Sequence, residues 1–158
     1  MKTILDRIDR GIVHALQKNA RLSNKELAAE IGLAQSSCRE RVRKLTDTGV
    51  LRGFHAEVSA DALGIAMRAI FAVRLRDQGP DAVQRFRELV GGLPEVVESF
   101  HVAGEDDFLL HVAVRDVDHL NRLWSHTLGQ HDVIARVRTS LVFEHHRKCS
   151  LPDLTEET

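Results

Sequence analysis

The chain has 158 residues, of which 43% are hydrophobic and 28% are charged, a composition typical of a soluble globular protein with one domain or two small ones. No apolar run approaches the roughly 20 residues that span a bilayer, and the N-terminus lacks the hydrophobic region of a secretory signal, so we expect a cytoplasmic protein that does not bind membranes. The two cysteines, Cys38 and Cys149, have no metal-ligand spacing and are expected to be a core residue and a tail residue.

The net charge of −1 conceals an asymmetry along the chain. Residues 1–55 contain 11 Lys and Arg against 6 Asp and Glu, a net charge of +5, whereas residues 56–158 contain 11 against 17, a net charge of −6. Because attraction to phosphates supplies most non-specific affinity for DNA, the basic part is the candidate DNA-contacting domain. Two unrelated domains of opposite charge would give the same asymmetry.

A first helix is predicted from about Asp6 to Lys18. Asp6 and Asp9 have the spacing of an N-cap followed by an acidic residue in the first turn. Apolar residues recur at helical spacing and predict one buried face that packs on the helices that follow: Leu5, Ile8, Ile12 and Leu16.

Two short helices follow, joined by the tight turn at Ile31-Gly32-Leu33. Ser23 and Glu26 form a capping box at the start of the first, in which each side chain accepts from the other residue's amide. In the second, Cys38, Val42 and Leu45 recur at helical spacing and predict a buried stripe. Such a pair is how many proteins enter a major groove, and the alternative is an ordinary helical hairpin with a solvated basic face.

The second helix of this pair carries the candidate DNA contacts. Arginine bonds guanine in bidentate fashion, which discriminates against a wrong base by roughly 1 to 3 kcal/mol, although phosphate contact is an equal alternative for any one side chain. Arg41 either joins this surface or points sideways and pairs with an acid. The predicted contacts are Arg39, Arg43 and Lys44, with Gln35, Ser36, Ser37 and Glu40 as readers of base edges.

Thr48-Gly49 is predicted to end the recognition helix, since glycine tolerates the left-handed conformation found at helix ends. The weak alternation of Val50–Val58, with Gly53 as a turn, predicts a small β wing, so that residues 1–55 form a winged helix-turn-helix domain. Residues 56–66 lack a strong hydrophobic period and are expected to be a linker.

Residues 67–148 are predicted to form a second domain. Alternating or apolar strand patterns and helical periods occur in the order βαββαβ, with the two middle strands paired as a hairpin. This is the ferredoxin-like split βαβ arrangement, so the fold class is α+β. The predicted elements are strands 67–75, 96–103, 108–114 and 133–143, with helices opening at Gly79-Pro80-Asp81 and Asp116, the second ending at Gly129. Residues 149–158 form a C-terminal tail, of which the polar stretch Leu151–Thr158 is expected to be frayed.

A ferredoxin-like sheet has both helices on one side, and its other face would expose apolar side chains. We therefore expect a second copy to cover that face, giving at least a homodimer. A two-fold axis would also place two recognition helices on half-sites about one helical turn apart.

The motifs together resemble the Lrp/AsnC family of transcriptional regulators over nearly the whole chain. The resemblance is carried by Leu5-Asp6-x-x-Asp9, Arg21-Leu22-Ser23, Glu26-Leu27-Ala28, Ile31-Gly32-Leu33, Arg41-x-x-x-Leu45, Gly49-Val50-Leu51, Gly53-Phe54-x-Ala56 and the hairpin Val102–Leu110. It implies a regulator with an effector-binding domain of the RAM or ACT type that dimerises, often assembles into tetramers or octamers, and senses amino acids or related small molecules where dimers meet.

Two segments depart from the family pattern. Ala34 stands where the family has serine at the N-cap of the recognition helix, and the missing side-chain acceptor costs about 1 kcal/mol of local stability. The helix is therefore expected to be able to start later, at Ser36 or Ser37. The family's Asp-x-Asp-Tyr hairpin is here Glu105-Asp106-Asp107-Phe108, so the identity of an effector cannot be carried over from the family.

The turn Gly104–Asp107 is the candidate effector site, because a carboxylate beside exposed amides can hold both charged groups of a free amino acid. A solvated turn without a ligand is the alternative. The predicted effector-binding residues are Ser99, His101, Gly104, Glu105, Asp106, Asp107, Thr139 and Ser140. No metal site is expected at His145-His146, since adjacent residues of a strand point to opposite faces.

The sequence therefore predicts a regulator that binds specific double-stranded DNA under the control of an amino acid or related metabolite, without a cofactor or enzymatic activity. Two alternatives stay open. Some decarboxylases of modified tetrapyrroles, the sirohaem decarboxylases, are similar to this family in both domains, but four basic residues on the recognition helix argue against that activity. An architectural protein would bend or wrap DNA with little sequence choice and no effector.

Overall fold

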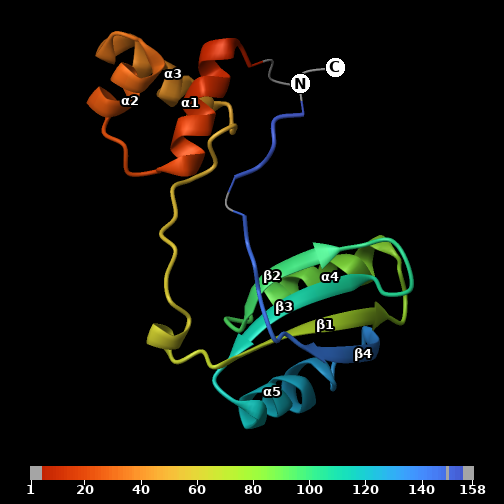
Figure 1. The fold of residues 1–158 in the computed structure, drawn as a ribbon. Helices are drawn as coiled ribbons and strands as arrows, with labels where there is room; N and C mark the ends of the chain where they lie inside the picture. Colours follow the sequence, from red (N-terminus) through yellow and green to blue (C-terminus); the bar gives the residue numbers. More distant parts are fainter. Residues whose placement is uncertain (1–4, 149, 155–158) are drawn as a thin grey trace. The chain divides into compact units, whose positions relative to one another are not determined.

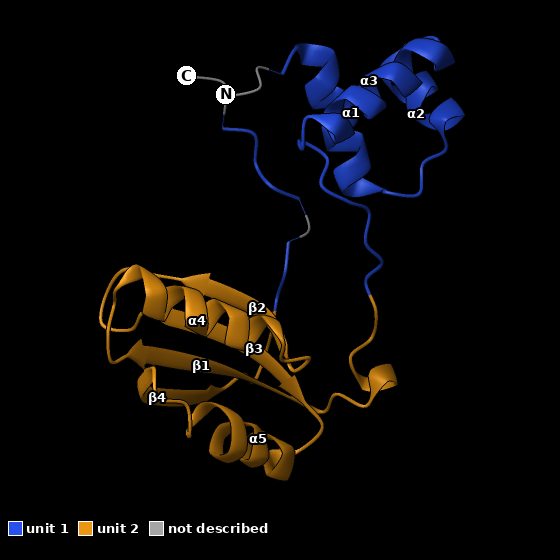
Figure 2. Cartoon of the chain, turned by 180° about the vertical axis from the view of Figure 1, so that it is seen from behind, with its two compact units in different colours: residues 1–57, 146–158 blue, residues 58–145 orange. Residues whose placement is uncertain are grey.

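The computed structural model describes residues 5–148 and 150–154, so Cys149 lies outside the described residues. The chain divides into two compact units, one formed by the chain up to Glu57 together with the segment from His146, the other by residues 58–145 (Figure 2). The described helices are all too short or too polar to cross a membrane.

Three helices build the first unit: α1 (Arg7–Lys18), α2 (Asn24–Ile31) and α3 (Gln35–Asp47) (Figure 1). Both predicted N-terminal caps are capping boxes in the structure, Asp6 with Asp9 and Ser23 with Glu26. Gly32 ends α2 with φ of 76°, a left-handed conformation that leads the chain directly toward α3.

The helix α3 begins at Gln35 even though Ala34 provides no side-chain cap, so the expectation of a later start is wrong. The physical reason is tertiary: Cys38 is fully buried in the core, and the Asn24 side chain donates through Nδ2 to the Gln35 carbonyl at 2.9 Å. Cys38 is a core residue, as predicted, and burial raises the pKa of its thiol. The rest of this core is apolar: Ile12, Ala15, Leu16, Leu27, Ala28 and Leu45.

The predicted β wing does not form. The structure has no strand between Val50 and Val58, and Phe54 and Val58 remain 52% and 57% exposed. A short alternating segment needs neighbouring strands or a helix to bury its apolar side, and an isolated hairpin lacks both. Farther along, one short 3₁₀ helix, η1 (Asp61–Leu63), interrupts the segment expected to be a linker.

The second unit is a four-stranded antiparallel sheet with two helical segments. Strands β1 (Met67–Leu75), β2 (Val96–His101), β3 (Phe108–Val114) and β4 (Ile134–Leu141) lie in the order β2-β3-β1-β4. Helix α4 (Pro80–Gly91) follows β1, and α5 (Val117–Leu123) continues into the π-helical turn η2 (Trp124–Leu128). The ferredoxin-like βαββαβ order is confirmed, with β2 and β4 each shorter than predicted.

One face of the sheet holds the core of this unit. Phe71 and Val73 of β1, Leu110 of β3 and Phe86 of α4 are fully buried, and Leu128 of η2 packs in the same cluster. Figure 2, seen from behind, shows α4 in front of the sheet, whereas in Figure 1 the strands lie in front of it. The helices pack on the core face, and we call the opposite face the open face. It carries Arg68, Ile70, Ala72 and Arg74 of β1, which are half-buried, and His111 of β3, which is buried beside His145.

The segment after β4 returns to the first unit. The Leu151 amide donates to the Gln17 side chain at 2.6 Å, and Asp153 forms an ion pair with Arg10 at 3.3 Å. The expectation that Leu151–Thr158 is frayed is therefore wrong for Leu151 and Asp153. The polar composition of the segment gave no indication of its partners, because they lie more than 130 residues earlier in the chain.

Candidate nucleic-acid interface and ligand-binding turn

The outward side of α3 presents all seven predicted DNA contacts to solvent. This holds because the apolar stripe Cys38, Val42 and Leu45 faces the other two helices. Within the described part of the chain, the basic side chains of this set make no hydrogen bond or ion pair. The exposed set is Gln35, Ser36, Ser37, Arg39, Glu40, Arg43 and Lys44.

Arg41 is the one arginine of α3 that points inward. Its Nη1 lies 2.6 Å from Asp6 Oδ2 and 2.8 Å from Asp9 Oδ1, the two acids of the capping box on α1. The hydrogen bonds to Asp6 and then Asp9 raise the pKa of the guanidinium, and the Asp9 amide and Arg41 together lower the pKa of Asp6. The alternative in which Arg41 pairs with an acid is the correct one.

The charges of α3 suit contact with nucleic acid. Solvent-exposed guanidinium and ammonium groups can replace counterions along a phosphate backbone, and hydroxyl, amide and carboxylate groups near the helix start can bond base edges. A helix preceded by α2 and the Gly32 turn has the order of a helix-turn-helix, in which the second helix enters the groove. All seven residues are exposed, as contact with a ligand requires, and their individual roles stay predictions.

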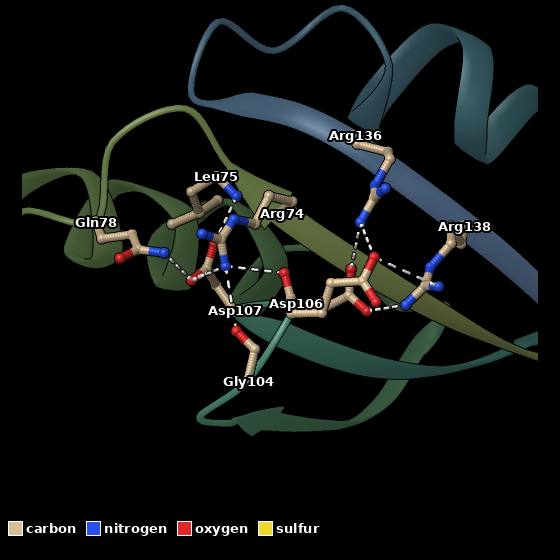
Figure 3. A network of polar contacts seen from close by, with 9 residues as sticks. Arg74, Leu75, Gln78, Gly104, Asp106, Asp107, Arg136 and Arg138 are labelled. Carbon is tan, nitrogen blue, oxygen red and sulfur yellow. Dashed lines mark hydrogen bonds and ion pairs between the residues drawn. The ribbon is translucent and has the colours of Figure 1, made fainter.

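The turn between β2 and β3 has a different electrostatic character, because its carboxylates are held by the protein itself (Figure 3). Asp107 is 7% exposed, and its carboxylate accepts from the Leu75 amide and from the Gln78 side chain, both at 2.8 Å. Its own amide donates to the Val73 carbonyl at 2.8 Å. Asp107 therefore fixes the turn to the end of β1 and has little capacity left for a ligand.

Glu105 and Asp106 face two arginines of β4. Arg136 Nη2 lies 2.7 Å from Glu105 Oε1 and 3.6 Å from Asp106 Oδ1, and Arg138 bonds Asp106 and thereby has a raised pKa (Figure 3). Arg74 donates to the carbonyls of Gly104 and Glu105 at 3.3 and 2.8 Å. Gly104 has φ of 139°, a conformation that side chains rarely adopt.

The remaining predicted effector residues lie at opposite edges of the sheet. Ser99 and His101 are on β2, where the His101 ring stacks on Phe108 with ring centroids 4.6 Å apart, whereas Thr139 and Ser140 are on β4. Two strands separate these edges, a distance of roughly 14 Å at about 4.8 Å per strand. Within one chain, the eight predicted residues do not form a single pocket.

The three arginines that bind the turn, Arg74, Arg136 and Arg138, are not among the predicted site residues. Arg136 and Arg138 are two residues apart on one strand and so share a face, a signal that was available. Their acidic partners were not predictable from spacing, because the contact requires β4 to lie beside β1, where Arg136 pairs with Arg74 in register. In the described part of the chain, no group of three or more His, Cys, Asp or Glu side chains is placed to hold a metal ion.

Comparison with known sequences supports each unit separately. Residues 5–46 match the AsnC-type helix-turn-helix domain, and residues 68–151 match the Lrp/AsnC ligand binding domain. The chain is 38% identical over 146 residues to the transcriptional regulator AldR of Mycolicibacterium smegmatis, covering 92% of this chain and 85% of the relative. It is 35% identical over 140 residues to the leucine-responsive regulatory protein of Escherichia coli, covering 89% and 85%. These relatives lend no support to a tetrapyrrole decarboxylase.

Solved structures agree over most of the chain. A transcriptional regulator of Neisseria meningitidis, crystallised as a complex with L-methionine, superposes with a TM-score of 0.87 at 31% identity, covering 94% of this chain and 97% of that one. AsnC of Escherichia coli superposes with a TM-score of 0.81 at 26% identity, covering 90% and 95%. Together with the exposed basic side of α3 and the βαββαβ unit, these matches show that the chain belongs to the Lrp/AsnC family of transcriptional regulators.

Proposed function

We propose that this regulator reads a specific DNA sequence with the outward side of α3. The observation that carries the proposal is the contrast among the arginines of α3: Arg39 and Arg43 are exposed and unpaired in the described structure, whereas Arg41 is neutralised against α1. The positive charge that α3 offers a ligand is thus confined to one side. Gln35, Ser36, Ser37 and Glu40 supply the base-edge donors and acceptors, and Lys44 supplies a phosphate contact.

We propose that an amino acid or a related small metabolite controls this binding. The relative from Neisseria meningitidis was solved with L-methionine, and the turn of this chain combines carboxylates, guanidinium groups and main-chain carbonyls in one place. Glu105 is the exposed carboxylate of the turn and the best placed to meet an ammonium group. Because Ser99 and Thr139 lie at opposite edges, a pocket that uses both requires more than one copy of the chain.

We propose that a second copy covers the open face of the sheet, giving a dimer that can assemble further into tetramers or octamers. Ile70 and Ala72 of β1 and Leu109 of β3 lie on that face, and the neighbouring Phe100 of β2 is 47% exposed. Arginines border this apolar strip on β4. A dimer presents two α3 helices to one duplex, and an effector can favour one assembly only by binding it more tightly than the others.

Selection of bound DNA from a random pool, with and without a mixture of amino acids, tests the proposal. We expect one enriched motif built from two half-sites about one helical turn apart, and a change in its occupancy when the effector is present. Enrichment of no motif, with equal affinity for all duplexes, would indicate the architectural alternative instead. An enriched motif whose occupancy no amino acid changes would leave the DNA proposal standing and remove the effector.

A further inference from the structure

We propose that Arg41 is a positioning residue for DNA reading. The apolar stripe decides which side of α3 faces outward, and the clamp of Arg41 between Asp6 and Asp9 narrows the remaining rotation of α3 about its axis, so that Arg39 and Arg43 face the duplex in one setting. The inference rests on the proposed DNA-reading function of α3. It concerns a side chain that does not touch DNA and that the DNA-binding surface does not include.

The geometry of the helix places Arg41 opposite the reading side. Each residue of an α-helix advances about 100° around the axis, so Arg39 and Arg43, two residues to either side, point roughly 160° away from Arg41. Arg41 side-chain exposure is 33%, and that of Asp9 is 12%, so the clamp is partly covered where α3 crosses α1. An anchor on the back of the helix therefore fixes the direction of its front.

The acids of the clamp are themselves held in place. Asp6 accepts from the Asp9 amide at 2.8 Å, and the Asp6 amide donates to Asp9 at 3.4 Å, so both carboxylates belong to the first turn of α1. Two carboxylates against one guanidinium leave no positive charge at this point. Arg41 is thus removed from the set of groups that attract phosphate, and its bonds serve orientation.

Apolar packing decides which side of α3 is buried, and Arg41 adds a finer, directional constraint. Cys38 and Leu45 lie one turn before and one turn after Arg41, and their contacts with α1 and α2 are nondirectional. The two short, charged hydrogen bonds of Arg41 are directional and hold one rotational setting. Loss of the clamp is therefore expected to broaden the setting of α3 rather than to remove a DNA contact.

The test compares Arg41→Gln with Arg43→Gln in full-length protein, measuring affinity for the selected motif and for a scrambled duplex over a range of salt concentrations. For Arg41→Gln we expect at least a tenfold fall in the ratio of specific to non-specific affinity, with an unchanged salt slope on the scrambled duplex. For Arg43→Gln we expect weaker binding to both duplexes and a salt slope reduced by about 0.9, as for one lost phosphate contact.

Asp6→Asn separates positioning from folding. Asparagine caps a helix about as well as aspartate, so this variant keeps the start of α1 and removes one of the two charges that face Arg41, leaving that of Asp9. We expect it to lower the specificity ratio in the same direction as Arg41→Gln, while Arg41→Lys, which retains a cation, restores part of the ratio. Thermal melts verify that each variant is folded at the temperature of the binding measurement.

Three results would overturn the inference. The first is an unchanged ratio of specific to non-specific affinity in both Arg41→Gln and Asp6→Asn. The second is an equal loss of affinity for both duplexes with a smaller salt slope, and the third is a lower melting temperature with the wild-type affinity ratio. The second would make Arg41 a phosphate contact, and the third a stabilising residue only. If wild-type protein itself discriminates between no duplexes, the proposed function fails instead, and the two failures are distinguishable.

Discussion

Two charged regions of this protein, the outward side of α3 and the turn Gly104–Asp107, show how differently a folded chain can use its charges. On α3, Arg39, Arg43 and Lys44 have no partner among the described residues. In the turn, each carboxylate accepts from an arginine or an amide of the same unit. Unpaired exposed charge is available to a ligand, whereas paired charge stabilises the fold and yields to a ligand only in exchange for its present partner.

The substitution with the largest expected effect is Asp107→Ala, which tests whether the paired carboxylates of the turn stabilise the fold. The substitution leaves the buried Leu75 amide without an acceptor and removes the bond from Gln78, so we expect the free energy of unfolding of the second unit to fall by about 2 to 4 kcal/mol. Urea denaturation measures the loss. Glu105→Ala, which removes an exposed carboxylate, is the control and should cost about 0.5 kcal/mol or less. Equal costs would mean that the turn is not held by Asp107.

Arg39→Ala tests whether the unpaired charge on α3 is available to DNA. If Arg39 reads a base edge, affinity for the selected motif should fall by roughly 1 to 3 kcal/mol, with a much smaller loss on scrambled DNA. Titrations at one fixed salt concentration compare the two duplexes. An equal loss on both would demote Arg39 to a phosphate contact and leave base reading to Gln35, Ser36, Ser37 and Glu40.

His111 provides a pH-dependent test on the open face of the sheet. It is 7% exposed, its ring centroid is 5.0 Å from that of His145, and Arg68 bonds His145 at 2.9 Å. Burial first, then His145 and Arg68, lower the pKa of His111 below its ordinary 6.5, against the opposing effect of Glu98. Because the folded protein favours the neutral ring, its stability is complete above about pH 6.5 and falls as the pH decreases, by up to about 1.4 kcal/mol per pH unit.

Thermal melts between pH 7.5 and 5 measure this dependence. We expect the melting temperature to fall on the order of a few degrees per pH unit for a chain of this size. His111→Gln should flatten the profile in that interval, since the variant has no ring to protonate. His126→Gln, at an exposed histidine of the same unit, should leave the profile as in the wild type. The same steepness in His111→Gln would assign the acid sensitivity to another group.

The smallest expected effect is an increase in the stability of the first unit. Ala34 has the extended conformation of an N-cap without a side-chain acceptor, so Ala34→Ser should stabilise the first unit by about 1 kcal/mol. Hydrogen exchange of the α3 amides measures this change in stability, because these amides belong to the first unit and not to the second. Ala29→Ser, an exposed position within α2, should instead be slightly destabilising, and stabilisation by both substitutions would argue against a capping effect.

What the sequence alone determined was local or periodic. The capping boxes at Asp6 and Ser23, the buried stripe of α3 and each element of the βαββαβ series depend on residues a few positions apart. Their relation is the same in any protein that contains that element. The exposed side of α3 was predictable for the same reason, since it is the complement of the buried stripe.

Only the tertiary structure decided which distant groups meet. It turned Arg41 toward Asp6 and Asp9, placed Arg138 beside Asp106, brought Leu151 to Gln17, and left the expected wing without strands. Such contacts follow from how whole elements pack, and packing depends on the summed burial of many side chains rather than on any short motif. An arginine in a sequence therefore reveals its charge, whereas the availability of that charge to a ligand depends on the partners that folding brings within reach.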